Sequence, residues 1–98
     1  MTTFEERERA FEAKFAHDAE MRFRAEARAI KNLGLWAARA RGREGAEAVD
    51  YARGMMSQWL DRGGLDILLE EAAKESGGAL DAAALRRRHR EFLAEAKA

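Results

Sequence analysis

Few side chains in this chain could act as nucleophiles, general bases or metal ligands. The 98 residues include no cysteine, one tyrosine (Tyr51) and two histidines, His17 and His89, which lie far apart in the sequence. Ser57 falls in a predicted helix and Ser76 in a predicted turn, and neither has the surroundings of a nucleophile elbow. His89 is expected near the inward face of the last helix as a partly buried, satisfied histidine. The sequence therefore predicts a protein that is not an enzyme.

His17 and Asp18 form a candidate metal pair, because both residue types can bind zinc. Adjacent residues on a helix do not face one another, however, and no second pair of ligands follows them. The segment "SGGALD" (Ser76–Asp81) lacks the spacing and the lysine of a phosphate-binding loop. We therefore expect a solvated polar pair, with no metal site and no cofactor.

The densest charge in the chain is "RRRHR" (Arg86–Arg90), in the predicted last helix. Arg86, Arg87 and Arg90 could hold a phosphate, a nucleotide or an acidic partner, because guanidinium groups form paired hydrogen bonds with such anions. The other interpretation is a solvated helix face whose arginine stems cover neighbouring apolar residues. We favour the second interpretation and keep a small nucleotide- or anion-binding module as the alternative function.

A row of three phenylalanines near the N-terminus is the strongest binding signal in the sequence. Phe4, Phe11 and Phe15 are separated by seven and four residues, so on a helix they share one face. The segment "FEAKFAHD" (Phe11–Asp18) carries the second half of this row, and charged residues surround it. Such a row must be buried against something, either this protein's own core or a groove on a partner.

The elements that must position these residues are helices, and we predict an all-α protein. Thr3 and Glu6 form a capping-box pattern, which predicts a helix that begins at Thr3 and meets no breaker until Gly42. The absence of proline permits helices of this length. Glycine-containing loops separate the later helices. The helices of a four-helix bundle are expected at about 19–41, 46–61, 65–76 and 82–97.

The predicted core comes from one apolar face of each helix. On the first helix, Phe23, Ile30, Leu33 and Ala37 share a face. On the second helix, the predicted inward side carries Val49, Ala52, Met56, Trp59 and Leu60.

The length of the first helix divides the chain into two parts. From Thr3 to Arg41 it would span roughly 58 Å at 1.5 Å per residue. A compact domain of this size is roughly 30–35 Å across, and the other helices could cover only roughly 20–25 Å of the first. We therefore expect a bundle at 19–98, preceded at 1–18 by a mobile, partly helical arm. The arm should be partly disordered when free, because an isolated helix of that length is marginal in water.

The composition excludes several classes of protein. The net charge is zero, and acidic segments (1–20 and 46–80) alternate with basic ones (21–45 and 81–98). This pattern does not match the net basic face of a nucleic-acid-binding protein. No apolar run approaches the roughly 20 residues of a membrane span, and the charged N-terminus is not a signal peptide. We expect a cytoplasmic protein that does not insert into the membrane and is a monomer when free.

Three segments of the sequence are similar to a known family. The segment "MTTFEERERAFEAKFAHDAEMRF" (1–23), with "NLGLWAA" (Asn32–Ala38) and "GAEAVDYA" (Gly45–Ala52), resembles the ATPase inhibitor subunit zeta of the F-type ATP synthase of alphaproteobacteria. The resemblance covers most of the chain and is most specific in its first 38 residues.

The resemblance implies a four-helix protein that inhibits ATP hydrolysis by the F1 part of the synthase, peripheral to the inner membrane when bound. In that family the N-terminal segment enters a catalytic interface between the alpha and beta subunits, against the gamma subunit, and blocks rotation in the hydrolysis direction. Here that segment is Thr3–Asp18. The resemblance also leaves room for weak ADP or ATP binding by the basic last helix. The contacts expected in the arm are Phe4, Arg7, Phe11, Lys14, Phe15 and His17.

Overall fold

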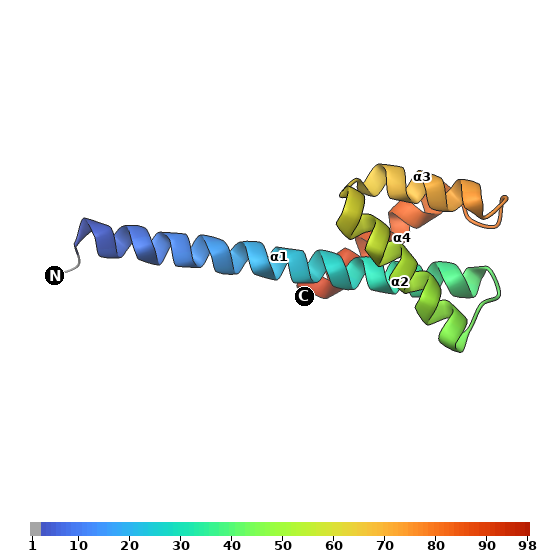
Figure 1. Ribbon diagram of the computed structural model, residues 1–98, viewed down its shortest axis with the longest axis horizontal. Coiled ribbons are helices and arrows are strands. Elements are labelled where there is room, and N and C mark those ends of the chain that lie inside the picture. Colours follow the sequence, from blue (N-terminus) through green and yellow to red (C-terminus); the bar gives the residue numbers. More distant parts are fainter. Residues whose placement is uncertain (1–2) are drawn as a thin grey trace.

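The computed structural model describes residues 3–98, and in these residues it contains four α-helices and no strand. Helix α1 spans Phe4–Ala40, α2 Gly45–Arg62, α3 Leu65–Glu75 and α4 Ala82–Lys97. In Figure 1, α1 is a long rod, and its second half carries the other three helices. Helices α2 and α4 pack against α1, and α3 packs against α2 and α4. The predicted all-α class with four helices is confirmed.

Helix α1 begins where the sequence predicts. The Glu6 backbone N–H donates to the Thr3 hydroxyl at 3.2 Å, and the Thr3 backbone N–H donates to the Glu6 carboxylate at 3.2 Å. A cap of this kind is worth about 1 kcal/mol of helix stability. At the other end, Gly42 has a φ of 79°. Residues with a Cβ atom rarely adopt this left-handed conformation, so the glycine allows the chain to turn there.

The predicted division at residue 18 is not a break in secondary structure. Helix α1 is continuous over 37 residues, or about 55 Å at 1.5 Å per residue, and the longest dimension of the molecule is 63 Å. The radius of gyration, 17.4 Å, exceeds the roughly 12–13 Å of a compact domain of this length. Ala25 is the first buried residue of α1. The partial disorder of a free arm stays a prediction, and residues 1–2 of the arm lie outside the described residues.

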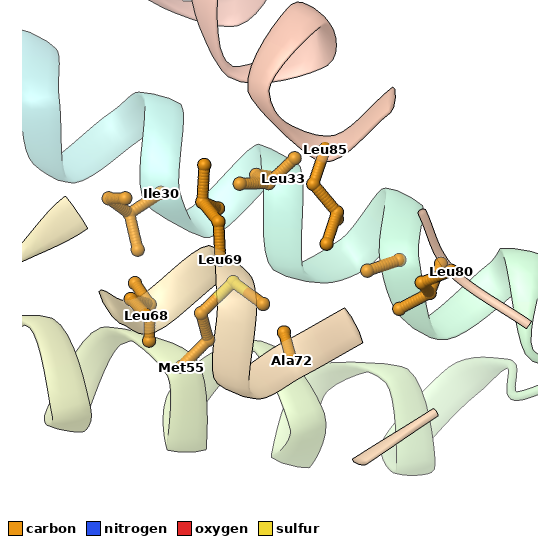
Figure 2. Packing of buried hydrophobic residues seen from close by; sticks show 9 residues of the cluster. Ile30, Leu33, Met55, Leu68, Leu69, Ala72, Leu80 and Leu85 are labelled. Carbon is orange, nitrogen blue, oxygen red and sulfur yellow. The ribbon is translucent and has the colours of Figure 1, made fainter. Parts of the chain in front are cut away.

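The core lies between the second half of α1 and the other three helices (Figure 2). Ile30 and Leu33 of α1, Leu69 of α3 and Leu85 of α4 are fully enclosed. Full burial of one such side chain is worth about 1.5–3 kcal/mol relative to exposure. This cluster fixes the C-terminal half of α1, and therefore the direction in which its N-terminal half projects. The other buried members are Ala37, Met55, Leu68, Ala72 and Leu80.

The prediction that Phe23 belongs to the core is wrong. Its side chain is 52% exposed, and its ring stacks on that of Trp59 with the centroids 5.6 Å apart. Phe23 lies two residues before Ala25, at the edge of the packed region, where α2 covers one side of α1 only. The pair therefore closes the edge of the bundle.

The predicted inward side of α2 is also partly wrong. The buried residues of this helix are Ala48, Ala52 and Met55, whereas Val49 and Leu60 are 41% and 58% exposed. Periodicity identified an apolar side that was wider than the contact with α1. The helix turns its small residues toward α1, and the larger ones are left beside the contact.

Gly34 determines how closely α1 and α2 approach. A Cβ atom at this position would lie 2.7 Å from the Ala52 Cα atom and 3.0 Å from its Cβ atom. Real Cβ atoms essentially never approach another heavy atom to 2.7 Å. A glycine inside a helix ordinarily costs about 1 kcal/mol relative to alanine. Here the glycine allows the two helix backbones to pack in contact, which a residue with a Cβ atom would prevent.

Candidate partner-binding arm

The N-terminal part of α1 projects beyond the other helices (Figure 1), and three exposed aromatic side chains lie on it. We call Phe4, Phe11 and Phe15 the phenylalanine stripe. Their side chains are 81%, 72% and 64% exposed. Burial of each ring would contribute about 1.5–3 kcal/mol. A contiguous apolar row of this kind on a charged helix is typical of a surface that binds a partner.

The phenylalanine stripe continues the face of α1 that the bundle buries. Ala29 and Leu33 follow Phe11 and Phe15 by 18 residues, which is five full turns at 3.6 residues per turn. Both Ala29 and Leu33 are completely buried. The same face of one continuous helix is thus covered by this chain at one end and open at the other.

The charged residues expected to contact a partner are all exposed. Arg7 and Lys14 are seven residues apart and share one edge of the stripe. Neither has a carboxylate within 4.0 Å among residues 3–98. His17 follows Phe15 by two residues, about 200° around the helix, and so lies away from the stripe. Arg7 and Lys14 therefore border the stripe and His17 does not, and contact of any of the three with a partner stays a prediction.

The basic run of α4 is divided by the fold. Arg86 pairs with Asp66 of α3, and Arg88 lies over the rings of Trp36 and Phe92, with its Cζ atom 5.2 and 5.1 Å from their centroids. Arg87 and Arg90 are exposed. Among the residues described, neither of them has a carboxylate within 4.0 Å. Of the three predicted anion-binding residues, one therefore already has an internal partner.

His89 is buried between α4 and α1, but its Nε2 atom is not satisfied as predicted. The residue is 5% exposed, and its Nε2 atom has no hydrogen-bond partner in the described residues. The nearest carboxylate oxygen, on Glu26, is 3.6 Å away, too far for a hydrogen bond. Burial lowers the pKa of His89 below its ordinary 6.5, and the Glu26 carboxylate opposes this shift without cancelling it.

We expect the free energy of unfolding to decrease as the pH falls below about 6.5. His89 binds a proton more weakly in the folded chain, so protonation favours the unfolded chain. The stabilisation is complete above the ordinary pKa of 6.5 and is lost as the pH falls toward the lowered pKa. Urea unfolding at about pH 7.5 and about pH 5.5 tests this, because a histidine titrates between them.

Two substitutions serve as controls for the pH prediction. His89→Gln should unfold with a smaller pH dependence than the parent, because the titrating group is gone. Glu26→Gln should unfold with a larger one, because the carboxylate that opposes the pKa shift is gone. An equal pH dependence in the parent and in His89→Gln would contradict the assignment.

Sequence reasoning missed a groove between α1 and α2. Its walls include Leu35 of α1 and Val49, Met56 and Leu60 of α2. The spacing of these α2 residues indicates an apolar side of the helix, but in the sequence that side is expected to be part of the core. Within residues 3–98, no cluster of three or more metal-ligating side chains is present. No helix in this part of the chain is long and apolar enough to cross a membrane.

These features define a helical binding protein. A small bundle holds one end of a long amphipathic helix and leaves the apolar face of the other end open. An amphipathic helix that enters a groove on another protein is a common mode of recognition.

The chain belongs to the ATPase inhibitor subunit zeta family, whose sequence model matches residues 1–98, the whole chain. The resemblance seen in the sequence is thereby confirmed. No curated protein and no solved structure shows a significant match. The family assignment points to a regulatory role at an ATPase, and the described structure supplies an exposed element suited to such a role.

Proposed function

We propose that this protein inhibits ATP hydrolysis by the F1 part of the F-type ATP synthase and that Thr3–Asp18 is the inhibitory element. Membership of the ATPase inhibitor family supports the activity. The open phenylalanine stripe supports the choice of element, because α1 presents it on a helix already formed and fixed at one end.

The proposed mechanism is a wedge. The arm enters a catalytic interface between the alpha and beta subunits, against the gamma subunit, and buries the stripe there. Three rings at about 1.5–3 kcal/mol each contribute roughly 4.5–9 kcal/mol before the costs of association are subtracted. In this mechanism the bound arm holds the interface and so blocks rotation in the hydrolysis direction. The inhibitor supplies no chemical step. In the bound state, the protein is peripheral to the inner membrane on the cytoplasmic side.

Removal of residues 1–18 tests the choice of element. The chain of residues 19–98 keeps every buried residue of the described core, which begins at Ala25, so it should fold with helix lost only from the arm. We expect the full chain to inhibit ATP hydrolysis by the cognate F1. The half-inhibitory concentration of the shortened chain should be at least about 100-fold higher, as the loss of about 3 kcal/mol implies.

The two parts of the proposal fail in different ways. If both chains inhibit equally, the inhibitory element lies in the bundle. If neither inhibits, the function is wrong for this protein. Circular dichroism of the shortened chain shows whether a loss of inhibition comes from loss of the fold.

The alternative function, a nucleotide- or anion-binding module, has less support. It would use Arg86, Arg87 and Arg90, and of these Arg86 already pairs with Asp66. The two exposed arginines that remain provide cations without a built pocket around them.

A further inference from the structure

The α1–α2 groove is a second open apolar surface on this molecule. It has a volume of about 520 Å³. Leu35, Val49, Met56 and Leu60 supply its aliphatic walls. Val49 and Leu60 are 41% and 58% exposed, so the groove is uncovered over much of its length. Ala52, which packs closely on Gly34, also lies in the lining of the groove.

The groove faces away from the phenylalanine stripe. Lys31 and Leu35 lie two residues before and after Leu33, about 200° around α1 in either direction. Leu33 is on the face that continues the stripe. A partner element that fills the groove is therefore different from the one that contacts the rings, and the two contacts can be altered separately.

Two cations line the groove. Lys31 and Arg53 are exposed members of its lining. No carboxylate lies within 4.0 Å of either among residues 3–98. Aliphatic walls with cations complement a helix that presents apolar and acidic side chains on one face.

We propose that the α1–α2 groove binds an acidic amphipathic helix of the F1 part, as a second contact that holds the bundle against the enzyme. This inference rests on the proposed function. Lys31 follows Asp18 by 13 residues, about 20 Å along α1. With Thr3–Asp18 buried in the cleft, a groove about 20 Å further along α1 lies outside the cleft. Binding at two linked sites slows dissociation more than either contact alone.

Charge reversal in the full chain tests the groove. The double variant Lys31→Glu and Arg53→Glu keeps the stripe and places two like charges opposite the acidic helix. We expect its half-inhibitory concentration for F1 to rise about 10-fold or more, mainly through faster dissociation. The matched control, Lys74→Glu with Lys97→Glu, makes the same charge change on exposed residues outside the groove and should inhibit like the parent. Urea unfolding of both variants verifies the fold.

Cross-linking identifies the occupant directly. The chain has no cysteine, so a single introduced cysteine can be labelled with a thiol-reactive photo-cross-linker. Ser57→Cys places this probe in the groove, and Lys97→Cys places it outside the groove. The groove probe should cross-link to an acidic helical segment of an F1 subunit, and the outside probe should not. Cross-linking to a second copy of this chain, or to no partner, overturns the inference.

The inference and the proposed function fail separately. If the parent does not inhibit F1, the proposed function fails. If the parent inhibits and the groove variant inhibits equally well, the groove contact is wrong and the wedge stands.

Discussion

The double substitution Phe11→Asp with Phe15→Asp is expected to raise the half-inhibitory concentration for F1 by at least about 100-fold and to leave the bundle folded. Both rings are open to solvent in the free protein, 72% and 64% exposed. Their replacement removes no core contact. Loss of two rings from a buried interface costs about 3–6 kcal/mol, and each 1.4 kcal/mol is about a factor of ten in affinity.

The matched control uses the other side of the same arm. Ala13→Asp with Ala16→Asp adds the same two charges to exposed positions away from the stripe. This control costs the helix more intrinsic propensity, because alanine is the best helix former and phenylalanine is a poorer one. If the arm needed only its helix, the control would be the weaker inhibitor. We expect the alanine control to inhibit ATP hydrolysis much more strongly than the phenylalanine variant, in assays at equal ionic strength.

Two results would contradict this prediction. Equal inhibition by the phenylalanine variant and the parent would mean that the stripe does not enter the partner. A large decrease in the urea midpoint of the phenylalanine variant would mean that the rings fold back onto the bundle in solution.

Gly34→Ala and Gly54→Ala, the same chemical change in two helices, are expected to move stability in opposite directions. At Gly54 nothing lies within 4 Å of an added Cβ atom. Alanine there should raise the free energy of unfolding by about 1 kcal/mol through helix propensity. At Gly34 the added atom would meet the Ala52 backbone at 2.7 Å. Because the clash is with backbone, the cost should lie toward the upper end of the about 1–3 kcal/mol of an overpacked core, which exceeds the gain in propensity.

A second substitution tests whether a steric clash with Ala52 causes the loss of stability in Gly34→Ala. In the Gly34→Ala background, Ala52→Gly removes the side-chain methyl group that would lie 3.0 Å from the added atom, but the backbone clash at 2.7 Å stays. Ala52→Gly by itself costs about 1 kcal/mol of helix propensity, so we expect it to destabilise the Gly34→Ala chain less than it destabilises the parent, as measured by urea unfolding of all four chains. If Gly34→Ala stabilises the chain as much as Gly54→Ala does, the close approach of α1 and α2 is wrong.

Features fixed by neighbouring residues were predictable. The capping box of Thr3 and Glu6 set the start of α1, and the turn at Gly42 followed from a break in a long helical pattern. Length arithmetic identified more helix than the remaining chain could cover, and the rings of Phe4, Phe11 and Phe15 are indeed uncovered. These inferences needed only the helical repeat and the rise per residue.

Features that depend on contacts between distant segments were not predictable. Nothing in "RRRHR" shows that Arg86 would meet Asp66 while Arg87 would stay exposed. Nothing near His89 shows that Glu26 would lie 3.6 Å away, on another helix. The groove with Lys31 and Arg53 escaped prediction because its two walls belong to different helices.

Short-range patterns were enough to predict a helical protein, the positions of its helices and an apolar row at one end of the first helix. Which side of α2 is buried depends on its packing against α1, and no pattern within α2 shows this. Periodicity identifies the apolar side of a helix, but the distance between two helix axes decides which residues of that side contact the other helix. Here that distance is set by the missing side chain of Gly34, and the residues left open beside the contact line the groove.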